Sequence, residues 1–419
     1  MTLISIRTAI ETILSSVSSL DSQNVPLKDS LGLVLSEPVI AKDNVPFLDN
    51  SAMDGFAVRS YDLKSASILN PIKLKINSRM ILAGDGSQRI LNSGEAIRIM
   101  TGAIVPEECD AIVPVEDVSI EENFAIFCDC IEAEKNIRKS GEDMKAGSVV
   151  LERETIMTPA AFGTASAAGA DHVTVIRRPS VAVLTCGDEL ISFDKEISPG
   201  KVRNSNGIVL YGLLKELGCL SIDLGTARDE KLDLSEKLDS ARNADVILIS
   251  GGVSMGERDL IREVLDELGF KMKFWKVQVK PGKPLLFGIL NGKPVFGLPG
   301  NPVSTQVSFE IFVRPALLTI MGRSNIFRRT ERVLLEKELK RAPGRPEFLR
   351  VKLTSSDSGK YHVSPTKKEQ GSGITTSMLH ANGLLFVESE TIYIPKGESA
   401  PCLILDDWLS SEFGIKNSN

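Results

Sequence analysis

The feature that most constrains the fold is an alternation of short apolar runs with amphipathic stretches between residues 181 and 317. The apolar runs at 181–184, 246–249 and 295–298 have the length and composition of buried strands. Leucine, isoleucine and valine recur at helical spacing between the runs, and two of these stretches stop at Gly218 and Gly269. This alternation predicts a parallel sheet with helices on both faces.

The flanking segments follow other patterns. Residues 3–20 form an amphipathic helical pattern, and residues 45–147 and 328 onward carry short strand-like runs broken by turn residues. We therefore expect a multidomain α/β plus β protein. Its predicted parts are an N-terminal helix packed on the α/β domain (1–26), a small helical and mixed linking domain (27–44 plus 148–178), a β-rich inserted domain (45–147), a parallel-sheet α/β domain (179–327) and a C-terminal β-barrel-like domain (328–419).

Composition excludes several classes of function. The chain has 419 residues, with 49 Lys and Arg against 55 Asp and Glu, so it is not a generally basic nucleic-acid binder. Aromatic residues make up 5%, too few for a surface that stacks single-stranded bases. With only three histidines, a metal is better held by carboxylates, which favours Mg²⁺ over Zn²⁺.

The cysteines and the apolar runs bear on location. Of the six cysteines only Cys128 and Cys130 are close together, which favours free thiols over a disulfide or zinc framework. The first residues lack a signal peptide, and no apolar run approaches the ~20 residues that span a bilayer. We expect a cytoplasmic protein with no membrane insertion.

Polar turns follow each predicted strand of the α/β domain, at 185–189, 250–259 and 299–302. Ligands of open α/β sheets bind at the carboxyl ends of the strands, so these turns are candidate binding loops. Glycines in the second turn, Gly251 and Gly252, let the backbone approach a ligand. Nearby carboxylates would repel one another in a shared cleft unless a cation or a proton lay between them: Asp188, Glu189, Asp229 and Asp259. A structural turn and, for Asp259, a helix cap remain alternatives.

Three lysines, Lys276, Lys280 and Lys283, follow within eight residues. Strand alternation would place Lys276 and Lys280 on one face, and the Pro281-Gly282 turn would then present Lys283. Beside carboxylates, this group suggests a phosphorylated or oxyanion substrate with Mg²⁺. A solvated edge strand is the alternative.

The β-rich segment has dense polar loops at 46–57, 98–103 and 138–143. They could be simple turns, or they could form the opposite wall of a cleft. With the loops above they complete an ordered set of motifs: PFLDNSAMDGFA, RIMTGA, RKSGEDM, GDEL, SGGVSMGERD, VKPGKP, GLPGNPVS and QGSG. In this order and spacing, over nearly the whole chain, the set resembles the molybdopterin molybdenumtransferases, that is, the bacterial MoeA proteins and the gephyrin E domain.

The resemblance implies an elongated four-domain homodimer whose α/β domain is similar to the molybdopterin adenylyltransferases. It implies insertion of molybdate into adenylylated molybdopterin, assisted by Mg²⁺, with release of AMP and formation of molybdenum cofactor. The loops of the β-rich domain would face the α/β cleft of the other subunit. A molybdopterin adenylyltransferase and apo-molybdoenzymes are possible further partners.

Site residues follow from the motifs. Catalytic roles are implied for Asp54, Asp143, Glu189, Asp229 and Asp259, of which the last three would bind the metal. Substrate contacts are expected from Thr101, Gly251, Gly252, Ser254, Lys276, Lys280, Lys283, Pro299, Pro302, Arg345 or Arg350, and Ser372.

One departure from the family pattern stands out. Thr185-Cys186 replaces the usual Ser-Thr before Gly-Asp-Glu-Leu, and a thiol is a poorer hydrogen-bond donor if that position binds phosphate. Three other functions are weighed against the transferase. They are a molybdopterin adenylyltransferase, for which three further domains are not needed, a scaffold of the gephyrin type, and an unrelated Mg²⁺-dependent phosphotransferase.

Overall fold

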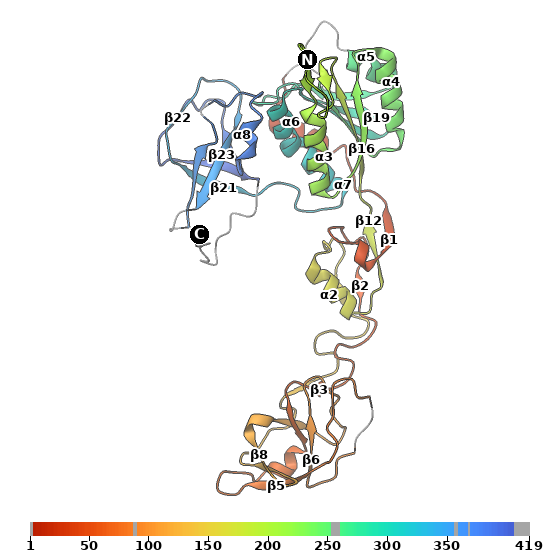
Figure 1. Ribbon diagram of the computed structural model, residues 1–419, viewed down its shortest axis with the longest axis vertical. Helices are drawn as coiled ribbons and strands as arrows, with labels where there is room; N and C mark the ends of the chain where they lie inside the picture. The colour runs from red at the N-terminus through yellow and green to blue at the C-terminus, as the bar shows by residue number, and fades with distance from the viewer. Residues whose placement is uncertain (1–2, 87–89, 253–259, 356–358, 368, 406–419) are drawn as a thin grey trace. The chain divides into compact units, whose positions relative to one another are not determined.

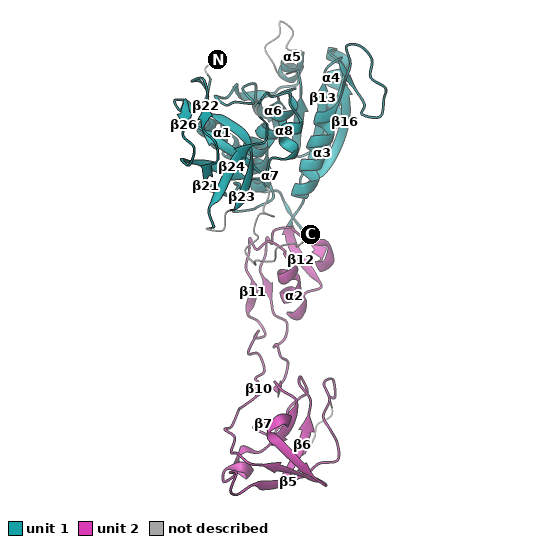
Figure 2. Ribbon diagram, turned by 60° about the vertical axis from the view of Figure 1, so that its left-hand side comes forward, with its two compact units in different colours: residues 1–23, 176–419 teal, residues 24–175 magenta. Residues whose placement is uncertain are grey.

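The computed structural model describes residues 3–86, 90–252, 260–355, 359–367 and 369–405. The chain divides into two compact units, residues 1–23 with 176–419 (unit 1) and residues 24–175 (unit 2), which Figure 2 colours separately. The finer five-part division stays a prediction.

Unit 1 contains the predicted α/β sheet. Its six strands lie in the order β16 (Leu220–Ala227), β13 (Ser180–Cys186), β17 (Val246–Ser250), β20 (Lys293–Leu298), β19 (Leu286–Leu290) and β18 (Lys271–Trp275), of which β16 and β19 are labelled in Figure 1. The first four strands are mutually parallel, as predicted, whereas β19 is antiparallel to β20 and β18 is antiparallel to β19. The parallel strands therefore all end at the same edge.

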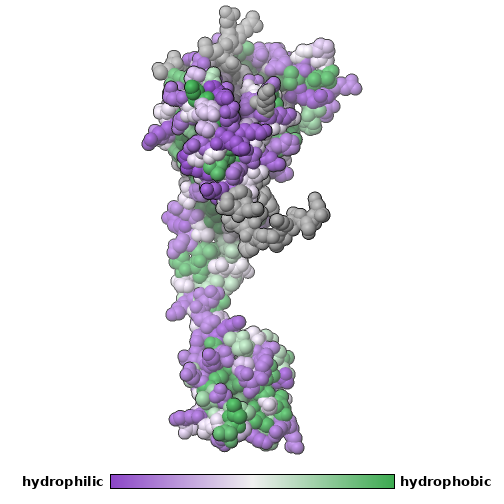
Figure 3. All heavy atoms as spheres, turned by 90° about the vertical axis from the view of Figure 1, so that its left-hand side faces the viewer, coloured by the Kyte–Doolittle hydropathy of each residue, from purple (hydrophilic) through white to green (hydrophobic). Residues whose placement is uncertain are grey.

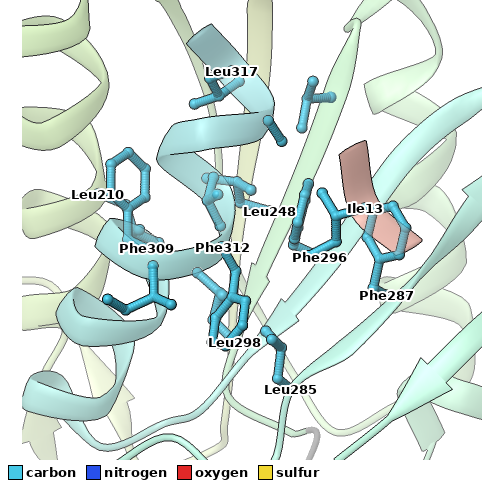
Figure 4. Close-up of a cluster of buried hydrophobic side chains, with 14 of the residues drawn as sticks. Ile13, Leu210, Leu248, Leu285, Phe287, Phe296, Leu298, Phe309, Phe312 and Leu317 are labelled. Carbon is cyan, nitrogen blue, oxygen red and sulfur yellow. The ribbon is translucent and has the colours of Figure 1, made fainter. Parts of the chain in front are cut away.

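Helices cover both faces of this sheet because successive residues of each strand point to opposite sides. Val181 and Val183 of β13 face a core shared with α1 (Ile6–Leu14), α3 (Ser205–Leu217), α6 (Pro302–Ser308) and α7 (Arg314–Ile320), part of which is drawn in Figure 4. Ala182 and Leu184 face a second core shared with α4 (Lys231–Ser240) and α5 (Leu260–Glu267). Double coverage explains why the strands are apolar throughout rather than alternating.

Helix ends follow the predicted signals in two places. Gly218 ends α3 in a left-handed conformation, with φ of 81°. Asn301 precedes α6 and Pro302 occupies its first turn, both of which are sequence signals of a helix start, but the Asn301 side chain forms no cap bond. A π-helical segment, Phe309–Val313, connects α6 to α7.

The last part of unit 1 is a closed barrel, which confirms the predicted barrel-like domain. Its strands are β21 (Thr330–Leu335), β24 (Tyr361–Pro365), β23 (Glu347–Ser355), β25 (Gly383–Val387) and β27 (Ser399–Ile404). Two short ladders, β14 (Leu190–Ile191) with β15 (Val202–Arg203) and β22 (Leu339–Lys340) with β26 (Tyr393–Ile394), and helix α8 (Thr376–Leu379) complete the unit.

Unit 2 is built around a mixed six-stranded sheet. Its order is β7 (Ala111–Pro114), β4 (Gly55–Val58), β6 (Glu95–Ile99), β5 (Ile72–Ile76), β9 (Phe124–Phe127) and β8 (Val118–Glu121). The predicted β-rich character of this segment is confirmed. The remainder consists of α2 (Pro159–Ala167) and three two-stranded ladders: β3 (Asn50–Ser51) with β10 (Ile137–Arg138), β2 (Val39–Ile40) with β11 (Val149–Leu151), and β1 (Ser22–Pro26) with β12 (His172–Ile176).

One predicted element is absent. Residues 276–280 do not form a regular strand, because Lys276 has a positive φ of 81° and only isolated bridges at Val277 and Lys280 continue the pairing. The expected alternation of the lysines on one strand face is therefore wrong.

The surface is mixed in character. On the face shown in Figure 3, hydrophobic residues form small separate patches among hydrophilic ones. Over the described ranges, the helices are all too short or too polar to cross a membrane.

Candidate active site at the carboxyl edge of the α/β sheet

A cavity of about 520 Å³ lies at the carboxyl ends of the parallel strands. Its wall includes Thr185 and Cys186 at the end of β13, Ser250 at the end of β17, and Pro299, which follows β20. The prediction that the three turns share one edge is thus confirmed. The lining also includes the predicted site residues Glu189, Asp229, Gly251, Gly252, Pro299 and Pro302.

Glycine is required in the turn after β17. Gly251 has φ of 92°, and a Cβ at this position would lie 2.3 Å from the Cys186 carbonyl oxygen. The backbones of the two neighbouring strand ends can approach this closely only without a side chain. Two predicted site residues of the same turn, Ser254 and Asp259, lie outside the described residues.

Asn204 connects the start of α3 to two strand ends. Its Nδ2 donates to the hydroxyl of Thr185 at 2.8 Å and to that of Thr226 at 3.2 Å. Its Oδ1 accepts the Gly207 N–H at 3.0 Å and so caps the helix. One side chain therefore holds β13, β16 and α3 together at the rim of the cavity.

Asn206 makes the equivalent connection on the other side. Its Nδ2 donates to the Ser250 hydroxyl at 2.9 Å and to the Gly300 carbonyl oxygen at 2.8 Å. Neither Asn204 nor Asn206 was among the site residues predicted from the sequence. The available signal was the Asn-Ser-Asn run immediately before the helical stripe that begins at Leu210, which is typical of a helix start.

The carboxylates at this edge are close enough to interact. The Asp188 carboxylate accepts the Asp229 N–H at 3.1 Å. Burial raises the pKa of the Asp229 carboxyl, and the negative charges of Asp188 and Glu189 raise it further. Within the described ranges, however, no three His, Cys, Asp or Glu side chains form a group that could hold a metal.

The lysines of the 276–283 segment have separate surroundings. The Lys276 ammonium lies 4.1 Å from the centre of the Trp275 ring. Lys280 forms an ion pair of 3.0 Å with Glu347 of the barrel, whose side chain is only 4% exposed. Lys283 is exposed, and the next residue, Pro284, lines the cavity.

Barrel residues reach the cavity rim through the turn after β20. The Ser372 hydroxyl accepts a 3.0 Å hydrogen bond from Asn301, and the Ser372 carbonyl accepts the Val303 N–H at 3.1 Å. Arg350 is fully buried and donates to the Gly371 carbonyl and the Ser377 hydroxyl. Arg345 donates to the Val279 carbonyl at 2.7 Å. The two arginines therefore support neighbouring loops in the described structure.

In unit 2 the three polar loops of the β-rich segment come together. Thr101 donates its N–H and its hydroxyl to Asp54, each at 2.7 Å, and these bonds lower the pKa of the Asp54 carboxyl. The Ser140 N–H donates to Asp49 at 2.8 Å, which joins the third loop to the first. Asp143 is exposed, and its N–H bonds to the Val45 carbonyl.

Comparison with known proteins decides the family. Models of the MoeA N-terminal region (domains I and II), of a probable molybdopterin binding domain and of the MoeA C-terminal region (domain IV) match residues 4–169, 182–319 and 332–405. The chain belongs to the MoeA family. The resemblance inferred from the ordered motifs is confirmed.

Relatives of the chain match it over nearly their whole length. It is 35% identical to a molybdopterin molybdenumtransferase of Haemophilus influenzae over 376 residues (89% of this chain, 91% of the relative). It is 32% identical to a protein of the same name from Staphylococcus aureus strain COL over 414 residues (98% and 97%). A solved MoeA protein involved in molybdopterin biosynthesis, from Pyrococcus horikoshii, superimposes with a TM-score of 0.82 at 30% identity, covering 97% of this chain and 100% of that one.

Proposed function

We propose that this chain is a molybdopterin molybdenumtransferase, which inserts molybdate into adenylylated molybdopterin and releases AMP. The observation that carries the proposal is the full-length match to MoeA transferases, which includes the two regions beyond the α/β domain. A molybdopterin adenylyltransferase would need only the α/β domain. A phosphotransferase of unrelated kind would not share all three matched regions.

The cavity suits a substrate that carries phosphates. Gly251 and Gly252, which line the cavity, would let the backbone approach a substrate, and the turn at Pro299 supplies a second wall. Lys276, Lys280 and Lys283, which follow on the neighbouring segment, would neutralise oxyanion charge on molybdate or phosphate. The barrel contributes Ser372 through its bond to Asn301.

We propose that a Mg²⁺ ion binds at the acidic side of the cavity, although the described residues alone do not supply three ligands. The pKa of Asp229 is raised first by burial and then by the negative charges of Asp188 and Glu189, and a cation would relieve the repulsion among these carboxylates. We propose Glu189 and Asp229 as ligands, together with Asp259, which lies outside the described residues. When bound, Mg²⁺ would stabilise negative charge that develops on phosphate oxygens as the phosphoanhydride breaks. The protein side chains would hold and orient that phosphoanhydride.

The loops of unit 2 give the proposal a second component. We propose that the chain forms a homodimer, in which Asp54, Thr101 and Asp143 of one subunit serve the α/β cavity of the partner. Sedimentation should then give about twice the 45.5 kDa of one chain. If the protein is a monomer at micromolar concentration and retains full activity, the proposal of a site shared between subunits is refuted. We further propose that the enzyme works in the cytoplasm and delivers its product to apo-molybdoenzymes.

The test is direct turnover. The purified chain, adenylylated molybdopterin, Mg²⁺ and molybdate should release AMP and reconstitute an apo-molybdoenzyme. Formation of adenylylated molybdopterin from ATP and molybdopterin would instead support the adenylyltransferase. Absence of both reactions, with retained binding of a partner peptide, would support a scaffold.

The metal assignment has its own variants. Asp229→Asn should sharply reduce AMP release, with partial recovery at high Mg²⁺ and little change in melting temperature. Asp239→Asn is the matched control, because Asp239 is an exposed carboxylate at the far end of α4. Asp259→Asn should behave like Asp229→Asn, since asparagine still caps a helix but carries no charge. AMP release at the parent rate across the whole Mg²⁺ titration would refute the metal role.

A further inference from the structure

The side chain of Asn206 connects two turns of the candidate active site that come from different strands. Ser250 ends β17 and is followed by Gly251 and Gly252, and Gly300 lies in the turn between β20 and α6. Along the chain the two turns are separated by residues 253–298, which include α5, β18, β19 and β20. A single amide nitrogen bonded to both is therefore a direct restraint on their spacing.

The orientation of this amide is determined by its partners. The Gly300 carbonyl oxygen can only accept a hydrogen bond, so the nitrogen of Asn206 must face it. The Asn206 side chain is buried, and its Oδ1 has no hydrogen-bond partner among the described residues. The bonds shown are therefore made by the nitrogen, and the structural effect of Asn206 depends on donation.

Two further bonds make the restrained turns a single assembly. The Gly251 N–H donates to the Leu298 carbonyl at 3.1 Å, and the Ser250 hydroxyl donates to the Pro299 carbonyl at 3.4 Å. A shift of the Gly300 turn would therefore move the Gly251 turn as well. Both turns line the cavity with their backbones, so their spacing sets the width available to a substrate.

We propose that Asn206 is a positioning residue for the transferase reaction: its side-chain nitrogen holds the Ser250–Gly252 and Pro299–Asn301 turns at the spacing that substrate binding needs. The proposal rests on the proposed function. The two turns would contact the substrate, whereas separate residues would bind the metal. Loss of the restraint should therefore raise KM more than it lowers kcat. Displacement of binding groups by about 1 Å is sufficient for large losses.

Two variants of similar size test the donor. Asn206→Asp keeps the shape but turns a repelling oxygen toward Gly300, and Asn206→Leu removes the donor without adding charge. Each should lower kcat/KM for AMP release about tenfold or more, mainly through KM. Hydrogen exchange should also become faster in peptides that contain residues 246–252 and 296–303, which is a readout independent of turnover.

Asn382→Asp is the matched control. Asn382 bridges the backbone of Leu353 in the barrel, with bonds of 2.6 and 3.2 Å, and does not line the cavity. Asn382→Asp should lower the melting temperature about as much as the Asn206 variants do, while its kcat and KM stay within about twofold of the parent values.

The outcomes separate the possibilities. If only Asn206→Asp raises KM, the effect is one of charge and the positioning role is refuted. If both Asn206 variants lose stability but keep parent kinetics, Asn206 is a purely structural residue and the proposal fails. Absence of AMP release by the parent protein would instead overturn the proposed function. In that case, unchanged hydrogen exchange in the Asn206 variants would separately refute the restraint.

Discussion

The Asp54 carboxylate accepts two hydrogen bonds from Thr101, one from its backbone N–H and one from its hydroxyl, each at 2.7 Å. Both residues were predicted to be part of the site, and the structure relates them: Thr101 fixes the direction of the Asp54 carboxylate. These bonds to the charged form are the main reason that the pKa of Asp54 is lowered, and the charge of Arg98 adds to the effect.

Replacement of the Thr101 hydroxyl should therefore act through Asp54. Thr101→Val keeps the side-chain shape and the backbone N–H but removes one of the two bonds. We expect the pKa of Asp54 to rise toward its ordinary value in an NMR titration, and AMP release to fall about tenfold at neutral pH. Thr101→Ser, which keeps a hydroxyl, should restore both. If Thr101→Val releases AMP at the parent rate, the reaction does not depend on the orientation of the Asp54 carboxylate.

Lys280 has a structural partner that changes what its removal should do. Without the structure, Lys280→Ala would be expected to weaken anion binding and leave thermal stability unchanged. Its ammonium, however, pairs with Glu347, which is nearly fully buried. Removal of Lys280 would leave the Glu347 charge only partly unpaired, because Arg341 lies 3.5 Å from the other Glu347 oxygen. We expect Lys280→Ala to lower the free energy of unfolding by about 1–3 kcal/mol and also to raise the molybdate requirement.

A double variant separates these two effects. Lys280→Ala with Glu347→Gln removes the unpaired charge, so stability in urea should largely recover. The raised molybdate requirement should remain if Lys280 binds the anion. Recovery of parent molybdate dependence in the double variant would mean that Lys280 serves only to pair with Glu347.

The fold was predictable where one pattern dominated. The alternation of apolar runs and helical stripes gave the parallel part of the sheet, because a doubly covered strand must be apolar on both faces. The failure at residues 276–280 has a physical cause. Alternating polar and apolar residues suit a strand, but the positive φ of Lys276 turns the chain out of extended geometry, and a sequence pattern does not encode that dihedral.

The site was predictable at the level of turns and less so for individual contacts. Strand ends identified the cavity because parallel strands finish at one edge. The bonds donated by the side-chain nitrogens of Asn204 and Asn206 join residues 19 to 94 positions apart, and periodicity carries no information on such pairs. Arg350 illustrates the opposite limit. Its motif context suggested substrate contact, whereas its complete burial in the barrel could be recognised only from the structure.

An ion pair between Asp245 and Arg177 gives a pH-dependent prediction. Burial alone would raise the pKa of Asp245, but bonds from Arg177 at 2.6 and 2.7 Å and from Ser180 outweigh it, and the pKa falls to about 2. A carboxyl whose pKa is lowered in the folded protein stabilises the fold at pH values above its pKa in the unfolded chain, near 3.8. This contribution disappears as pH falls through about 2.

Asp245→Asn should therefore lose about 1–2 kcal/mol of unfolding free energy at pH 7, discounted for the partial exposure of the pair. The difference from the parent should shrink below about pH 4 and vanish near pH 2. Denaturant titrations at several pH values measure this, with Asp239→Asn as an exposed control that should show no such trend. If the difference in unfolding free energy between Asp245→Asn and the parent stays constant over the whole pH range, the charge of Asp245 is not the source of the stabilisation.

Cys186 tests whether the departure from the family pattern alters the site. The residue contributes to the cavity lining, but its side chain is 3% exposed and packs in the core shared with α4 and α5. Burial raises the pKa of its thiol to about 12, with smaller contributions from Asp229 and Asp233. The thiol therefore remains protonated at neutral pH and lies on the opposite face of β13 from Thr185, which bonds to Asn204.

Cys186→Thr should consequently leave KM and kcat within about twofold of the parent values. It should lower the free energy of unfolding by about 1–3 kcal/mol, because the new hydroxyl enters an apolar core. Cys186→Val should be active and nearly as stable. In alkylation of the native protein, Cys128 and Cys130 should react first, since both are exposed, and Cys186 should react only on unfolding. A clear fall in KM for Cys186→Thr would mean that position 186 does donate to the substrate, and that the family's usual hydroxyl has been lost here at a cost in binding.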